Sequence, residues 1–178
     1  MQTPAFAATK TARTWKLFRG LIWVVAVMAA CLCPALAFGQ TNSSWNGGTG
    51  NWSDLGNWNP AAVPNNSGST TYDVKIGAPN SNVTMDVLND TIDNLTLSSK
   101  NSLAINAGDG LSLVSGTSRN SGTINVLGSL SNDLGDAFTN IGTIDNSGAF
   151  NNTGTTTNRG TLNNAGSGTV TTLGFQMG

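Results

Sequence analysis

The sequence contains no histidine and no glutamate, and all nine of its acidic residues are aspartate. Without histidine, no His-based catalytic triad or histidine metal site is available, and without glutamate there is no Glu general acid. Charged residues make up only 10 % of the 178 residues, against about 25 % in an average soluble domain. This low charge excludes long surface helices held by Glu–Lys pairs.

Cysteine is almost absent as well. The two cysteines, Cys31 and Cys33, lie within one apolar segment near the N-terminus. If that segment is removed, the remaining chain has no disulfide, no cysteine nucleophile and no thiolate metal site. We therefore predict no catalytic residue, no cofactor and no metal site. The abundant residues are Gly and Asn, with many Ser and Thr, and this composition fits either a turn-rich β protein or a disordered low-complexity chain.

Residues 1–39 predict an export signal. A basic region precedes an apolar run from Leu21 to Cys33, and Pro34 then breaks the helix. Ala35-Leu36-Ala37 supplies the small–x–small pattern of a signal peptidase site. We expect cleavage after Ala37 or after Gly39. The basic residues are Lys10, Arg13, Lys16 and Arg19.

Two other interpretations of this segment stay open. The uncharged stretch from Leu21 to Phe38 nearly suffices to span a bilayer, so the segment is alternatively a retained anchor. Met28-Ala29-Ala30-Cys31 loosely resembles a lipobox, which would make the chain a lipoprotein. In either case contact with the membrane is confined to this signal segment.

The rest of the chain is mildly acidic. From Gln40 onward nine Asp face four basic residues, giving a net charge of −5. This balance argues against nucleic acid and against an anionic membrane surface as partners.

Six-residue repeats dominate the second half, strictly in residues 121–132 and 141–170. Glycine and asparagine each recur every sixth residue, and a longer period of 18 to 20 residues overlies the hexads. The longer period aligns Asn120, Asn140 and Asn158; Gly122, Gly142 and Gly160; Ile124, Ile144 and Leu162; Leu130 and Phe150; and Gly128, Gly148 and Gly166.

This period is typical of a solenoid. Three strand-and-corner segments of about six residues close one coil, and successive coils stack through parallel backbone hydrogen bonds. We expect glycine at the corners for positive φ, asparagine in turns and in side-chain ladders, and the aliphatic columns inside. The fold class is therefore all-β, a parallel β-helix (β-solenoid) of about five to six coils after an N-terminal signal helix, with the repeats over residues 72–178.

Residues 72–118 lack strict hexads but show the same alternation of apolar and polar residues. We expect five groups of apolar residues to face inward: Val74 and Ile76; Val83, Met85 and Val87; Leu95 and Leu97; Leu103 and Ile105; and Leu111 and Leu113.

Residues 40–71 differ, because they hold Trp45, Trp52 and Trp58 among Gly, Asn and Pro. The first coil of a solenoid exposes an apolar cross-section that needs a cap, and we expect the indole rings to cover it. The competing interpretation is a platform on which sugar rings stack.

This Trp/Gly segment, followed by TTYDVKIG, the strand pairs and the SGTI and GTL hexads, resembles two groups of exported bacterial β-solenoids. They are autotransporter passenger regions with autotransporter-associated β-strand repeats, and PEP-CTERM-sorted exported proteins. The resemblance implies a secreted or cell-surface, non-enzymatic protein with an adhesive or matrix role. The chain shows neither a C-terminal barrel nor a Pro-Glu-Pro sorting tail, so the sorting mechanism is not carried over.

Three functions stay open at this point. The first is an extracellular structural or adhesive solenoid whose partners are polysaccharide or surface components. The second is a carbohydrate-binding or polysaccharide-cleaving β-helix, for which grouped carboxylates such as Asp86, Asp90 and Asp93 would be needed. Solvated turn and strand-face positions are the favoured explanation of these three aspartates. The third is a truncated fragment of a longer autotransporter-like protein, or a disordered product.

Overall fold

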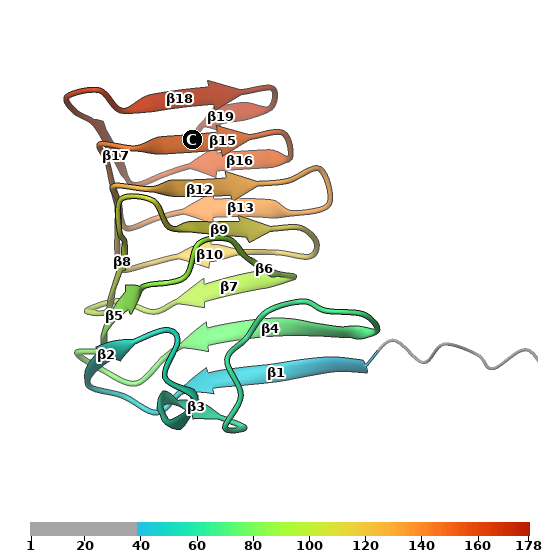
Figure 1. The fold of residues 1–178 in the computed structure, drawn as a ribbon. Coiled ribbons are helices and arrows are strands. Elements are labelled where there is room, and N and C mark those ends of the chain that lie inside the picture. Colours follow the sequence, from blue (N-terminus) through green and yellow to red (C-terminus); the bar gives the residue numbers. More distant parts are fainter. Residues whose placement is uncertain (1–38) are drawn as a thin grey trace, which may run out of the picture. The chain divides into compact units, whose positions relative to one another are not determined.

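The computed structural model describes residues 39–178. The predicted cleavage residue Ala37, both cysteines and the apolar run lie outside the described residues. The described part is a β-solenoid built from three sheets, A, B and C, in which almost all neighbouring strands are parallel (Figure 1). This confirms the predicted all-β parallel β-solenoid, while the predicted signal helix lies outside the described residues.

The chain visits the three sheets in turn. Sheet A contains, in order along the stack, β3 (Trp58–Asn59), β1 (Gly39–Trp45), β4 (Thr70–Ile76), β7 (Asn94–Leu97), β10 (Arg119–Asn120), β13 (Ala137–Asn140), β16 (Thr155–Asn158) and β19 (Phe175–Met177). Sheet B contains β2 (Thr49–Asn51), β5 (Asn82–Met85), β8 (Ser102–Ile105), β11 (Thr123–Val126), β14 (Thr143–Asn146) and β17 (Thr161–Asn164). Sheet C contains β6 (Asp90–Ile92), β9 (Gly110–Leu113), β12 (Ser129–Asn132), β15 (Ala149–Asn152) and β18 (Thr169–Thr172).

Five complete coils run from β4 to β18, each with one strand in every sheet (Figure 1). Strands β1 and β2 lie before them and continue sheets A and B, so residues 40–71 are built into the solenoid rather than forming a separate body. The short strand β3 pairs antiparallel with β1 and covers the outer edge of sheet A. A 3-10 turn, Leu55–Asn57, begins after Asp54, whose side chain accepts a hydrogen bond from the Gly56 N–H.

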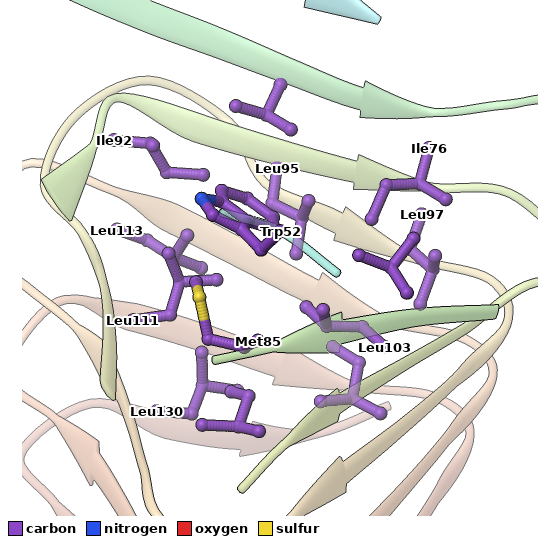
Figure 2. Close-up of a cluster of buried hydrophobic side chains, with 14 of the residues drawn as sticks. Trp52, Ile76, Met85, Ile92, Leu95, Leu97, Leu103, Leu111, Leu113 and Leu130 are labelled. Atoms are coloured by element: carbon purple, nitrogen blue, oxygen red, sulfur yellow. The ribbon is translucent and has the colours of Figure 1, made fainter. Parts of the chain in front are cut away.

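The core forms because successive side chains of a strand point to opposite faces. In β7, β8, β11 and β14 every second residue is buried. Figure 2 shows Met85, Leu103, Leu111 and Leu130 meeting inside the stack. All the expected apolar groups of residues 72–118 are buried, except Val87, which is partly buried against the core. Each fully buried aliphatic side chain stabilises the fold by roughly 1.5–3 kcal/mol.

The register confirms the long period. Ile124 pairs with Ile144, and Ile144 pairs with Leu162, in adjacent strands of sheet B. Leu130 pairs with Phe150 in sheet C, as expected. One alignment was wrong. Because Ala149 pairs with Thr169, Gly168 rather than Gly166 occupies the position above Gly148.

Asparagine ladders run along the stack, as the sequence predicted. The Asn120 side-chain amide donates to Asn140 Oδ1 at 2.8 Å, and Asn140 donates to Asn158 Oδ1 at 2.7 Å. A second ladder joins Asn132 to Asn152 in sheet C. These side chains are buried at the ends of their strands, and stacking lets each amide group find its partner in the next coil.

Glycine is required at the corners for a different physical reason from the one expected. Gly142 and Gly160 are not among the residues with positive φ. Instead, a Cβ on Gly142 would overlap the carbonyl oxygen of Gly122, and a Cβ on Gly160 would overlap that of Gly142. The repeat therefore requires glycine for the close approach of stacked corners, while positive φ occurs at other turn residues such as Gly166 and Lys100.

Candidate functional site

The three tryptophans of residues 40–71 form one aromatic cluster at the end of the solenoid where β1 to β3 lie. Trp45, Trp52 and Trp58 are 3 %, 0 % and 1 % exposed. Their rings meet edge to face, with centroids 5.0 Å apart for Trp45 and Trp58 and 4.7 Å apart for Trp52 and Trp58. Trp52 packs among the aliphatic residues of the core (Figure 2).

Two of the indole N–H groups are held by backbone carbonyls. Trp58 Nε1 donates to the carbonyl oxygen of Trp52 at 2.8 Å, and Trp45 Nε1 donates to that of Gly48 at 3.3 Å. With the rings buried and two N–H groups occupied, none of the three tryptophans presents an open face to a sugar ring. This geometry agrees with a cap on the apolar cross-section and disfavours the sugar-stacking platform.

The predicted carboxylate group does not converge on one cleft. Asp86 accepts hydrogen bonds from the backbone N–H and the hydroxyl of Ser53, at 2.9 and 2.6 Å, and ties the turn after β2 to the turn after β5. Asp93 lies at the start of the next coil, where its carboxylate accepts from Asn66 Nδ2 at 2.9 Å. Each carboxylate therefore joins two segments of the fold.

Asp90 points into the stack and is 6 % exposed. Its Oδ2 atom has no hydrogen-bond partner among residues 39–178. Burial raises the pKa of Asp90; the nearby Trp52 indole opposes that rise, and the charge of Asp86 adds to it. The side chain is enclosed by the fold rather than directed at a surface where a substrate would bind.

The structure also shows polar groups that the sequence analysis missed. Burial raises the pKa of Asp73, and the charge of Asp93 adds to the rise, while hydrogen bonds from Gln40 and Asn94 oppose it. Asp136, in the turn between β12 and β13, is 3 % exposed, and neither of its carboxylate oxygens has a partner of good geometry in the described part of the chain. Burial raises its pKa to about 6, although nearby Ser118 and Ala137 oppose the rise.

Two open depressions on the surface are lined mainly by polar or small residues. One, of about 220 Å³, lies on the outer face of sheet A and is lined mainly by polar residues of β1, β4 and β7, among them Asn42, Asp73, Lys75 and Thr96. The other, of about 490 Å³, follows the turns between sheets B and C over small residues such as Gly128, Ser129 and Gly148. Both are open to solvent and polar, so they suit contact with a hydrated surface or polymer better than enclosure of a small molecule.

Within residues 39–178 no group of three acidic, histidine or cysteine side chains is arranged to hold a metal ion. The same residues include no helix that is long and apolar enough to cross a membrane.

Comparison with known proteins adds no relatives: no family model, no curated protein and no solved structure matches the chain.

Proposed function

We propose that this chain is an exported, non-catalytic β-solenoid that serves as a structural or adhesive element, secreted or at the bacterial cell surface. The observation that carries the proposal is that most buried polar side chains of residues 39–178 form hydrogen bonds within the fold rather than gathering in a cluster free to act on a substrate. The buried asparagines bind one another from coil to coil, and Asp86 and Asp93 bind groups of the fold itself. What faces solvent is a repeated surface with few charges, which suits contact over an extended area.

The N-terminal sequence pattern supports an extracellular location. A basic–apolar–Pro–small pattern over residues 10–37 is typical of export, and the mature part would then lack cysteine. Stability without disulfides then comes from stacked repeats, since each coil buries its core only against its neighbours. The resemblance of residues 40–71 and of the hexads to autotransporter passenger regions and PEP-CTERM-sorted solenoids supports the same assignment.

The alternative, a polysaccharide-cleaving β-helix, needs two carboxylates that flank one bond of the substrate. Asp86 and Asp93 lie at different corners of a coil, after β5 and after β6, and Asp90 is enclosed. Binding of polysaccharide without cleavage is better supported, because the depression on sheet A is open and polar.

The proposal is tested by expressing the full chain in a bacterial host with a C-terminal tag and following where the tag appears. We expect tagged protein in the medium or at the surface, accessible to added protease, and a gain in attachment of cells or beads to polysaccharide-coated surfaces. A matched chain lacking residues 1–37 should remain inside the cell. Full retention of the complete chain in the cytoplasm would refute the proposal.

A further inference from the structure

The basic residues of the described chain are gathered on one side of the solenoid. Lys75 is exposed on the outer face of β4, and Arg119 is exposed on the outer face of β10, both in sheet A. Lys100 lies in the turn from β7 to β8, and Arg159 follows directly after β16. All four therefore lie on sheet A or on the turns that lead from sheet A to sheet B, and we call this set the basic strip.

The aspartates lie mostly elsewhere. Outside sheet A they occupy the start of the 3-10 turn, the turns on either side of sheet C, β6, and the outer face of β14: Asp54, Asp86, Asp90, Asp93, Asp109, Asp133, Asp136 and Asp145. The one aspartate of sheet A, Asp73, accepts a hydrogen bond from the Asn94 side chain beside it. A chain whose net charge is negative thus presents a positive strip along its axis, and such a strip attracts anionic ligands locally.

Strand register places two of these cations in one column. Ser44, Lys75, Thr96, Arg119, Thr139, Thr157 and Gln176 are paired from strand to strand across sheet A. Adjacent strands lie about 4.8 Å apart, so Lys75 and Arg119 are separated by about 10 Å along the axis, with the hydroxyl of Thr96 between them. The column offers cations, hydroxyls and an amide in a straight line.

Lys75 also borders both depressions on this side of the first coils. One is the 220 Å³ depression shared with Asn42, Asp73, Asn94 and Thr96. The other, of about 250 Å³, is lined by Ser44, Trp45, Lys75, Gly77 and Ala78. Lys75 in this column therefore lies beside concave surface rather than on a flat sheet.

We propose that the basic strip and its column bind an extended acidic polysaccharide, a polymer of uronate sugars, lying along the solenoid axis. Lys and Arg donate to carboxylates, while Ser, Thr, Asn and Gln exchange hydrogen bonds with sugar hydroxyls. This inference deepens the proposed function and rests on it, because the protein encounters such a polymer only if it is exported.

The spacing of the cations favours a sparsely charged polymer over nucleic acid. Duplex DNA carries one charge per roughly 1.7 Å of its axis, whereas the basic strip holds four cations over five coils. The tryptophans are buried, so they provide no platform for stacking the bases of a single strand. A uronate chain, with one carboxylate per sugar and hydroxyls between, matches the alternation of the column better.

The experiment measures binding of the purified full chain to polygalacturonate and to the same polymer fully methyl-esterified, with duplex DNA as a third probe. We expect binding to polygalacturonate that weakens with added salt, and clearly weaker binding to the ester and to DNA. The double variant Lys75→Gln/Arg119→Gln should lower affinity for polygalacturonate by about fivefold or more, because two charge contacts are lost.

The matched control is Ala104→Asp/Thr161→Asp, on the outer face of sheet B. It changes net charge by the same amount but leaves the strip intact, and we expect less than about a twofold change in affinity. Thermal melting of both variants verifies that they fold. Equal binding of polymer and ester, equal losses in the two double variants, or a preference for DNA would each overturn the inference. Export and surface attachment are measured separately, so failure of either proposal is distinguishable from failure of the other.

Discussion

Asn140 shows what makes a polar side chain stable inside this solenoid. It is 1 % exposed, accepts from Asn120 Nδ2, and donates to Asn158 Oδ1 at 2.7 Å and to the Thr161 carbonyl at 2.9 Å. Its partners come from the coils on both sides, so one truncation removes hydrogen bonds on two levels. We expect Asn140→Ala to lower the free energy of unfolding by roughly 2–4 kcal/mol, because buried partners are left unsatisfied. Urea unfolding measures this change.

Asn163→Ala is the matched control for Asn140→Ala. Asn163 is exposed on the outer face of β17 and donates one hydrogen bond, to Asp145 Oδ1. Its loss should cost less than about 0.5 kcal/mol, since water replaces the partner. Equal effects of the two substitutions would contradict a stabilising role for the buried ladder.

Asp136 carries a pH dependence whose sign follows from its burial. Its folded-state pKa is raised to about 6 from an ordinary value of 3.8, so the folded protein binds the proton more tightly than the unfolded chain does. The ionised carboxylate therefore costs stability above about pH 6, and that cost disappears as the pH falls towards 4. We expect Asp136→Asn to raise the melting temperature by a few degrees at pH 7 and to change it little at pH 4.

Asp133→Asn, in the same turn, serves as the control for Asp136→Asn. Asp133 is partly exposed, so water already solvates its carboxylate. We expect its substitution to change the melting temperature at pH 7 by less than Asp136→Asn does. An Asp136→Asn shift that does not depend on pH would show that burial of that charge does not destabilise the fold.

At the scale of the single strand, alternation decides which substitutions the fold tolerates. Ile144 faces the core and Thr143, one residue earlier in β14, faces outward. Ile144→Asp introduces an unpaired charge between Ile124 and Leu162, and we expect a loss of more than about 4 kcal/mol, much of the stability of an ordinary domain. Thr143→Asp should change stability by less than about 1 kcal/mol. Equal shifts in melting temperature would contradict the assignment of inward and outward faces.

The tryptophan segment makes a second prediction at this scale. Trp52 is fully buried against the first coils, so Trp52→Ala leaves a large cavity, and we expect a loss of roughly 3–5 kcal/mol. Leu55→Ala, in the nearby 3-10 turn, is the control because Leu55 is 57 % exposed. Melting temperature and retention on a polysaccharide column are measured together. Unchanged stability with lost retention would favour the sugar-binding interpretation over the cap.

The strands and their facing were predictable from the sequence because both depend on local patterns. Pairs such as Leu95 and Leu97 alternate with polar residues, and only one face of such a strand is apolar enough to be buried. The hexads also determined the register, since identical residues such as Asn120 and Asn140 stack on one another. The predicted alignment was wrong only at Gly166, because the turn from β17 to β18 is two residues longer than the turn from β14 to β15.

The polar clusters were not predictable, because their members are distant in the sequence. Gln40 and Asp93 are 53 residues apart and meet only through the pairing of β1, β4 and β7. Likewise, the sequence around Asp136 gives no sign that this carboxylate is buried. An apolar residue of the same turn, Leu134, is exposed while Asp136 is buried, which is the reverse of what hydrophobicity alone would predict. The positive side of the molecule depends in the same way on coil stacking, which brings Lys75 and Arg119 into one column.

At the scale of the whole molecule, the start of the solenoid favours one of the two predicted cleavage positions over the other. The sequence offers two cleavage positions, after Ala37 and after Gly39. In the structure Gly39 is the first residue of β1; its N–H donates to the Ser69 carbonyl at 2.8 Å, and it pairs with Thr70. Cleavage after Gly39 would remove that hydrogen bond and place a charged amino group at the start of the strand, whereas cleavage after Ala37 leaves β1 complete.

We therefore expect the mature protein to begin at Phe38. Mass spectrometry of the N-terminal peptide, on protein from the medium or the envelope, distinguishes Phe38 from Gln40 and from an intact Met1. Ala35→Asp/Ala37→Asp should block processing, because signal peptidase requires small residues at these positions; Thr41→Ala, on the other side of both sites, should leave processing unchanged. Protein from the medium or the envelope that retains Met1 would contradict cleavage. A start at Gln40 would show that β1 forms without its first residue.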